Sequence, residues 1–174
     1  LSEIDFYCSG AKISIQNSYH RPEIIKKDKD KDNGKSYLDV KGLRHPIVEK
    51  IHVDTEYVTN DILLGNDNKD GILLFGTNAC GKSTLMKAIG LNIIMAQAGL
   101  FVAAESFEYT PYTQIFTRIL NNDNIFRSQS SFAVEIQELK SIMNRADSKS
   151  LVLGDELCSG TESISALSII ATGL

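Results

Sequence analysis

The feature that most constrains the fold of this chain is the segment Gly76–Thr84 (GTNACGKST), which fits the pattern G-x-x-x-x-G-K-[ST]. An apolar run, Ile72–Phe75, precedes it, and a run with helical spacing, Lys82–Gln97, follows from its last residues. A strand, a glycine-containing loop and a helix in this order form the setting of a phosphate-binding P-loop. The sequence therefore predicts a strand–loop–helix unit that holds a phosphate-bearing ligand.

Each residue type in the loop has a chemical reason. Gly76 and Gly81 allow backbone angles that a side chain would penalise, so that successive N–H groups can turn toward phosphates. Lys82 brings a positive charge to the β- and γ-phosphates, and Ser83 supplies a hydroxyl to Mg²⁺. The plain alternative is a glycine-rich turn without a ligand. The predicted nucleotide-binding residues of the loop are Gly76, Thr77, Asn78, Ala79, Cys80, Gly81, Lys82, Ser83 and Thr84.

An acidic pair follows a second apolar strand, Leu151–Leu153. Asp155 is predicted to hold the Mg²⁺ shell, and Glu156 to polarise the water that attacks the γ-phosphate. Lys82 and Glu156 are therefore the predicted catalytic residues, and Ser83 and Asp155 the predicted metal residues. A glutamate directly after the strand aspartate is typical of hydrolases that couple ATP to large motions. No Asn-Lys-x-Asp motif follows the loop, so ATP is favoured over GTP.

The order of apolar runs predicts the fold class. Helical spacing is seen over Leu1–Asn17, Lys82–Gln97 and Phe132–Ala146, and strands are predicted at Ile72–Phe75, within Thr110–Leu120 and at Leu151–Leu153. Leu38–Leu64 is β-tending, and Gly65–Gly71 is a turn-rich connector. This order predicts an α/β, P-loop NTPase fold with a mostly parallel sheet flanked by helices.

Composition narrows the class of protein further. The formal net charge of −4 does not favour DNA binding by the chain as a whole. The three cysteines are widely spaced, which argues against a zinc site and a disulfide framework and favours a reducing compartment. Neither a signal peptide nor an apolar run of membrane-spanning length is seen. Both ends are expected to be cuts in a longer chain, because no initiator Met begins it and an apolar run, Ala166–Leu174, ends it.

At this point the chain resembles the MutS family, in seven segments that occur in the family's order and spacing. They are Leu43–Glu49, Tyr57–Asp61, Gly76–Thr84, Phe116–Ile119, Asn122–Asp123, Ser130–Glu135 and Ser150–Thr161. The resemblance covers nearly the whole chain. It implies that Leu1–Asn17 is the end of a lever helix and that residues 18–174 are an ATPase domain of the ABC type, truncated at its C-terminal end.

The resemblance also assigns roles to residues. It implies that Lys82, Ser83 and Asn78 bind phosphates and Mg²⁺ and that Tyr57 stacks on adenine. Asp155 and Glu156 would be the Mg²⁺ residue and the catalytic carboxylate. A half-buried strand tyrosine is the alternative interpretation of Tyr57.

The resemblance also implies a role for two further serines. Ser130 and Ser131 resemble the signature serines that reach the γ-phosphate of the partner subunit. Two hydroxyls before a helix could also serve as a plain N-cap, and one serine could do both. MutS proteins are dimers that recognise mismatched DNA and signal by ATP-driven closure, as sensors of DNA damage. The implied partners are therefore mismatched duplex, a second MutS-type subunit and a MutL-type protein, acting inside the cell at DNA.

The chain departs from the family pattern in places. Thr77 stands where the family usually has Pro, and Cys80-Gly81 replaces Gly-Gly; Cys80 is expected to be a tolerated small residue. These departures suggest a divergent branch, viral or organellar. The histidine that follows in the family lies past Leu174, so activity of this stretch alone stays open, and the mismatch-reading domain is absent.

Three other functions were weighed. A MutS relative acting in recombination or ribosome rescue is one, although the stretch Phe116–Ile119 favours the repair branch. An ABC-type transport module is another, but no Leu-Ser-Gly-Gly-Gln precedes Leu151. A module that binds ATP without turnover is the third, and Glu156 argues against it.

Overall fold

A computed structural model describes residues 1–26, 34–51, 56–66, 69–77, 79–118 and 131–155. The chain divides into two compact units, Leu1–Pro111 and Tyr112–Leu174. Each unit is described by itself. Among the described residues, no helix is both long enough and apolar enough to cross a membrane.

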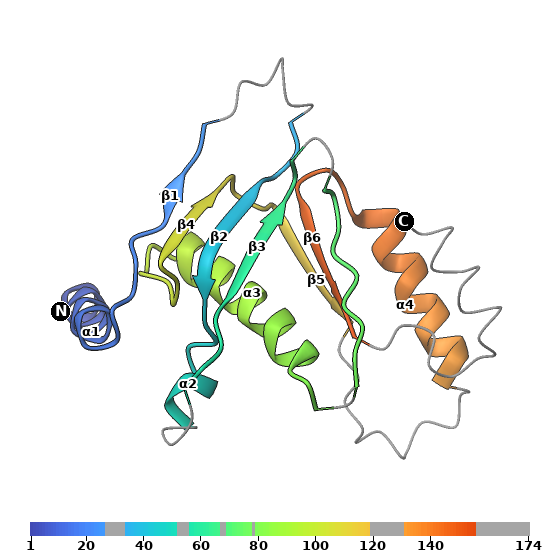
Figure 1. The fold of residues 1–174 in the computed structure, drawn as a ribbon. Coiled ribbons are helices and arrows are strands. Elements are labelled where there is room, and N and C mark those ends of the chain that lie inside the picture. Colours follow the sequence, from blue (N-terminus) through green and yellow to red (C-terminus); the bar gives the residue numbers. More distant parts are fainter. Residues whose placement is uncertain (27–33, 52–55, 67–68, 78, 119–130, 156–174) are drawn as a thin grey trace. The chain divides into compact units, whose positions relative to one another are not determined.

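The first unit contains a four-stranded mixed sheet in the order β1-β4-β2-β3 (Figure 1). Its strands are β1 (Glu23–Ile24), β2 (Leu38–Leu43), β3 (Asn60–Leu64) and β4 (Ser106–Tyr109). β1 runs parallel to β4, whereas β2 is antiparallel to both β3 and β4. Side chains alternate along β2, with Leu38 and Val40 buried and Lys41 exposed, as expected for a strand with one face in the core.

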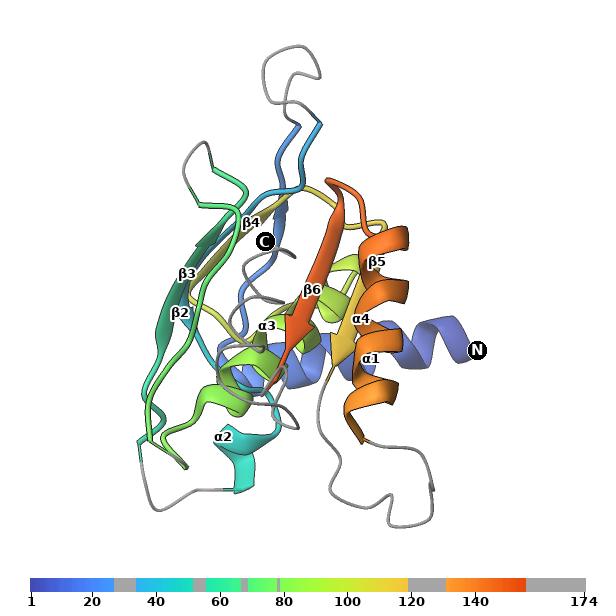
Figure 2. The ribbon, with the colours of Figure 1, turned by 90° about the vertical axis from the view of Figure 1, so that its right-hand side faces the viewer.

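Three helices belong to the first unit: α1 (Ser2–Asn17), α2 (Val48–Ile51) and α3 (Lys82–Gln97). α3 runs across one face of the sheet (Figures 1 and 2). It buries a row of residues that includes Met86, Ile89 and Ile93, and the sheet contributes Val40 and Phe107 to the same core. Burial of each large apolar side chain contributes about 1.5–3 kcal/mol, so these contacts anchor α3 against the sheet.

The second unit pairs β5 (Gln114–Arg118) with β6 (Ser150–Gly154) in parallel and packs α4 (Ser131–Arg145) against them (Figure 2). Arg118 Nε on β5 lies 2.8 Å from Glu138 Oε2 on α4, with the geometry of an ion pair rather than a hydrogen bond. The guanidinium of Arg145 lies over the Phe116 ring, 5.4 Å from its centroid. Together these contacts hold α4 to β5.

The predicted helices and the two downstream strands are confirmed. α3 has the predicted bounds, and α1, α4, β5 and β6 differ from the predicted ranges by a few end residues. The mostly parallel sheet is a wrong prediction for the first unit, whose sheet is mixed. The physical reason is that β2 pairs antiparallel with both β3 and β4, and the spacing of apolar runs does not reveal which strands pair.

The predicted strand at Ile72–Phe75 is not confirmed either. Its residues belong to neither sheet, and Leu73 and Phe75 are 79% and 90% exposed. An apolar run forms a strand only where it finds a partner edge, and composition alone cannot say whether one is available. In the described structure this run is an extended lead into the loop that follows.

Candidate nucleotide site

The ammonium group of Lys82 lies against the loop that precedes α3. Lys82 Nζ donates hydrogen bonds to the carbonyl oxygens of Gly76 at 2.7 Å and Thr77 at 2.8 Å. The same nitrogen lies 3.8 Å from Cys80 Sγ. The loop therefore curls back over the first residue of α3 and holds a positive charge inside its curve.

The backbone conformation of the loop explains why position 81 is a glycine. Gly81, at the N-cap of α3, has a φ of 94°, which lies in the left-handed region that favours glycine. Ala79 also has a positive φ, 63°, which costs a residue with a Cβ about 1–2 kcal/mol. Strain of this kind concentrates at ligand-binding loops. Because Gly81 has no side chain, no capping oxygen from it occupies the N-terminus of α3, where an anion is attracted.

The loop is open to solvent. Gly76, Thr77, Ala79, Cys80 and Gly81 are exposed, and the first three residues of α3, Lys82, Ser83 and Thr84, are half-buried. A ligand therefore has access to the loop, while the residues that follow are anchored in the helix. Asn78 lies outside the described residues.

The acidic strand end lies in the second unit. Asp155 follows β6, is half-buried, and its N–H donates a hydrogen bond of 2.8 Å to the carbonyl oxygen of Arg118 on β5. The strand thus presents the aspartate at its carboxyl end, as predicted. Glu156 and Ser130 lie outside the described residues, and Ser131 is the first residue of α4. The loop before α3 and Asp155 belong to different units, so the structure does not join them in one site.

Tyr57 lies between α2 and β3, outside any strand, and is half-buried. The interpretation of Tyr57 as a strand residue is therefore wrong. Burial raises the pKa of the Tyr57 hydroxyl, and a hydrogen bond with the backbone of His45 opposes that rise.

The imidazole of His45 binds the backbone at the start of α2. Its imidazole is buried, and its Nδ1 accepts the N–H groups of Ile47 at 3.2 Å and Val48 at 3.3 Å. Two donors on Nδ1 place the ring proton on Nε2 in the neutral imidazole. Burial lowers the pKa of His45, which favours the same neutral form.

A buried polar cluster beside His45 was missed by sequence reasoning. Arg44 NH1 lies 3.1 Å from Glu49 Oε2, and the Tyr19 hydroxyl donates a 2.9 Å hydrogen bond to Glu49 Oε1. The Glu49 side chain is only 6% exposed, so both of its oxygens are matched in a desolvated setting. Arg44 and Glu49 belong to the segment Leu43–Glu49 that carries the resemblance, but no pattern in the sequence joins them to Tyr19.

Comparison with known proteins finds that the chain is similar to MutS proteins. The family model described as MutS domain V matches residues 72–173. A DNA mismatch repair MutS homologue of Acanthamoeba polyphaga mimivirus is 41% identical over an alignment that covers 100% of this chain. A mitochondrial DNA mismatch repair MutS homologue of Sarcophyton glaucum is 40% identical over 98% of the chain. DNA mismatch repair protein MutS of Fusobacterium nucleatum is 40% identical over 97% of the chain. The chain spans only 17–18% of the length of these relatives.

Proposed function

Since this chain belongs to the MutS family, we propose that residues 18–174 are the ATPase domain of a DNA mismatch repair protein and that Leu1–Asn17 is the helix leading into it. The names of the relatives describe mismatch repair proteins from a virus, a mitochondrion and a bacterium. We therefore expect an intracellular protein that acts at DNA. The fold proposed for the domain is that of P-loop NTPases.

One observation carries the proposed ATP binding. The Lys82 ammonium lies inside the P-loop on the carbonyl oxygens of Gly76 and Thr77, at the start of α3. An ammonium group, a glycine N-cap without a side chain and an exposed loop are the parts that a phosphate chain requires. On phosphate binding, Lys82 would exchange its carbonyl acceptors for phosphate oxygens, which bind a cation more strongly.

A divalent cation is proposed to accompany the nucleotide. The hydroxyl of Ser83 and the carboxylate of Asp155 supply the oxygen ligands that Mg²⁺ prefers, and Asp155 stands at the carboxyl end of β6. We propose that these two residues hold Mg²⁺ with ATP. The bound cation would neutralise negative charge on the phosphates. Tyr57, half-buried beside His45, is proposed as the surface on which adenine stacks.

The proposed hydrolysis depends on Glu156, which would accept a proton from the water that attacks the γ-phosphate. Ser130 and Ser131 are proposed to reach the γ-phosphate of a partner subunit, so that two copies close around ATP. α4 begins at Ser131, so its N-terminal N–H groups start at the predicted contact. Closure of the dimer is proposed to drive a clamp on mismatched duplex and to signal to a MutL-type protein.

The experiment that tests this function separates binding from hydrolysis. The full-length protein that contains this chain is assayed for binding of a fluorescent ATP analogue and for phosphate release, each with and without Mg²⁺. Glu156→Gln is expected to bind the analogue as the native protein does and to release phosphate at least about a hundredfold more slowly. Glu3→Gln, which removes an exposed carboxylate on α1, is the matched control and should change neither quantity.

Two results would contradict the proposal. If Glu156→Gln hydrolyses ATP at the native rate, Glu156 is not the catalytic base. If the native protein binds the analogue equally well without Mg²⁺, the proposed roles of Ser83 and Asp155 fall.

A further inference from the structure

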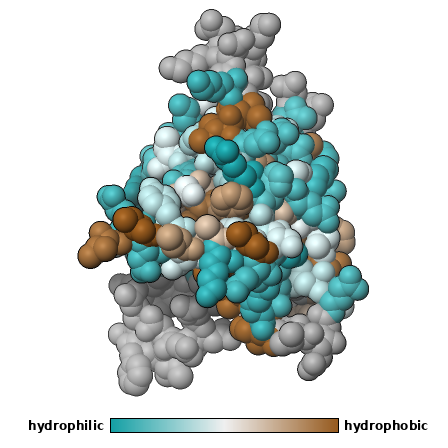
Figure 3. Space-filling model, turned by 90° about the vertical axis from the view of Figure 1, so that its left-hand side faces the viewer, coloured by the Kyte–Doolittle hydropathy of each residue, from teal (hydrophilic) through white to brown (hydrophobic). Residues whose placement is uncertain are grey.

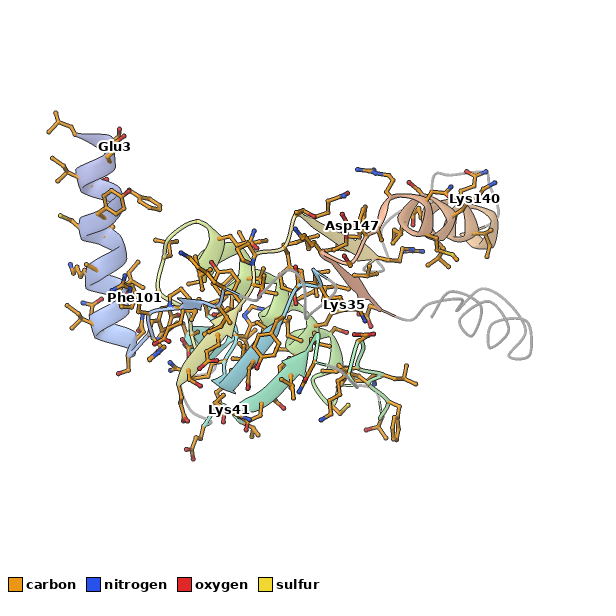
Figure 4. The ribbon with its side chains drawn as sticks, turned by 90° about the horizontal axis from the view of Figure 1, so that it is seen from above. Glu3, Lys35, Lys41, Phe101, Lys140 and Asp147 are labelled. Carbon is orange, nitrogen blue, oxygen red and sulfur yellow. The ribbon has the colours of Figure 1, made fainter. Side chains whose placement is uncertain are left out.

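α1 is joined to the first unit through its C-terminal half. Ser14 is the buried residue of the helix, whereas Leu1, Ile4 and Tyr7 are more than half exposed. Figure 4 shows the helix leaving the unit, with Glu3 at its far end and Phe101 beside its last turns. Figure 3, which views the unit from this side, shows hydrophobic side chains on the surface among hydrophilic ones. Any force on α1 must therefore enter the unit through the last turns of the helix and the residues that hold them.

The side chain of Arg44 holds the C-terminal end of α1. Arg44 NH2 donates to the carbonyl oxygen of Asn17, the last residue of the helix, at 3.3 Å and to that of Ser18 at 3.1 Å. Its guanidinium lies over the Tyr19 ring, 5.7 Å from the centroid. A cation at a helix C-terminus meets both the unpaired carbonyls and the negative end of the helix dipole.

The same guanidinium is fixed from its other side. Arg44 NH1 pairs with Glu49 on α2, and Glu49 also accepts the Tyr19 hydroxyl, so that the end of α1 and α2 share one desolvated cluster. The planar fork of an arginine presents preorganised donors to carbonyl oxygens on one side and to a carboxylate on the other. The Arg44 side chain therefore connects the C-terminal end of α1 to α2.

The backbone of Arg44 reaches the helix that follows the P-loop. Its carbonyl oxygen accepts a 3.0 Å hydrogen bond from Asn92 Nδ2 on α3, and its N–H donates to the carbonyl oxygen of Ala103 at 2.8 Å. Asn92 is fully buried and also donates to Ala88 O and accepts from Ala103 N–H. One path from α1 to α3 thus runs through Arg44 and the buried amide of Asn92.

The next residue along the chain links this path to Tyr57. His45 follows Arg44, its backbone lies close enough to the Tyr57 hydroxyl to lower the pKa of that group, and its imidazole accepts the N–H groups of Ile47 and Val48. Arg44 and His45 together contact the end of α1, α2, the buried amide on α3 and the tyrosine proposed to stack on adenine. A shift of α1 would displace Arg44 and His45, and with them α3 and Tyr57, which are proposed to contact the nucleotide.

We propose that Arg44 is a positioning residue that couples the C-terminal end of α1 to the nucleotide site, through its side chain on one side and its backbone on the other. This inference rests on the proposed function, because it requires that the P-loop bind a nucleotide. Arg44 contacts neither the loop nor the proposed ligand and acts through Asn92, Glu49 and His45. Its removal should therefore uncouple α1 from the site without emptying the site.

Hydrogen–deuterium exchange of the full-length protein tests the coupling. Exchange is followed by mass spectrometry with and without the Mg²⁺ complex of a non-hydrolysable ATP analogue, and analogue affinity is measured on the same samples. In the native protein, the analogue should change exchange both in residues 82–97 and in residues 14–20. In Arg44→Gln, the change in residues 82–97 should persist, while that in residues 14–20 should be lost.

Two further variants secure the interpretation. Arg44→Lys keeps a charge beside Glu49 but lacks the fork, so it should fold as the native protein does and respond more weakly in residues 14–20. Arg21→Gln removes an exposed arginine close to the same helix end and should respond as the native protein does.

The outcomes that overturn the inference differ from those that overturn the function. If no variant and no native protein binds the analogue, the proposed function fails and the coupling falls with it. If the analogue binds but residues 14–20 do not respond, or respond equally in Arg44→Gln, the coupling is wrong while the function stands. If Arg44→Gln and Arg44→Lys both lose their helical circular dichroism, Arg44 serves stability alone, and the coupling is likewise wrong.

Discussion

Lys82 Nζ donates a hydrogen bond of 2.7 Å to the carbonyl oxygen of Gly76, so the last part of the sequence motif closes on its first residue. This contact places a positive charge inside the loop rather than in the solvent around α3. Carbonyl oxygens are weaker partners for an ammonium than phosphate oxygens, since they carry only a partial charge. The loop is therefore arranged around a cation that a phosphate chain would bind better.

Replacement of Lys82 by alanine should weaken nucleotide binding. Loss of charge-assisted hydrogen bonds worth about 1.5–3 kcal/mol corresponds to a rise of about 10- to 150-fold in the Kd for ATP. Fluorescence titration with an ATP analogue measures this change in Kd. Lys87→Ala removes an exposed lysine further along α3 and should leave the Kd unchanged. Equal affinities for both variants would remove Lys82 from the proposed site.

Gly81→Ala should destabilise the first unit through the backbone alone. The φ of 94° is strained for alanine, and an added Cβ would meet no atom within 4 Å, so the expected cost is about 1–2 kcal/mol. Gly71→Ala is the matched control, because its Cβ is also in open space and its φ is not in the left-handed region. Urea unfolding of both variants measures the difference. A stability of Gly81→Ala equal to that of Gly71→Ala would show that the loop does not keep this conformation in solution.

His45 should make the protein less stable in mild acid. Burial, with a smaller contribution from Lys87, holds the pKa of His45 below its ordinary value of 6.5. The unfolded chain therefore takes up a proton at a higher pH than the folded one. The contribution of neutral His45 to the free energy of unfolding is fully present above about pH 6.5. It is lost as the pH falls toward the lower pKa of His45 in the folded state. His45→Asn, which cannot titrate, should show a smaller fall in Tm between pH 7 and pH 5, within the usual range of histidine titration. An unchanged pH dependence would contradict this assignment.

Asn92→Ala should be among the more damaging substitutions in α3. It leaves the N–H of Ala103 and the carbonyl oxygen of Arg44 without their buried partner, and each unsatisfied group costs about 1–3 kcal/mol. Asn144→Ala, at an exposed position of α4, should change stability by no more than about 0.5 kcal/mol. Thermal unfolding of the two variants compares them. A similar Tm for both would show that the amide of Asn92 is dispensable.

The sequence predicted the local parts of this structure well. The bounds of α3 follow from Gly81, which suits a helix start, and from the apolar spacing up to Gln97. β6 follows from the short apolar run Leu151–Leu153, which precedes Gly154 and Asp155. These features are encoded within a few residues of one another, so periodicity and turn chemistry reveal them.

What the sequence did not reveal depends on residues far apart in the chain. Tyr19 and Glu49 are thirty positions apart, and no spacing rule joins a helix end to a later carboxylate. The exposed run at Ile72–Phe75 was predicted as a strand because its composition is apolar, but pairing requires an edge that composition does not supply. The role of Arg44 likewise emerged only when its side chain and its backbone were seen to contact different helices.

Turnover of ATP by the full-length protein, measured with mismatched duplex, with perfectly paired duplex and without DNA, tests the central claim most directly. The proposed function predicts that mismatched duplex changes the rate of phosphate release relative to paired duplex, and that Lys82→Ala abolishes turnover under all three conditions. Turnover that is the same with every duplex and without DNA would contradict the proposed role in mismatch repair, even if ATP is hydrolysed.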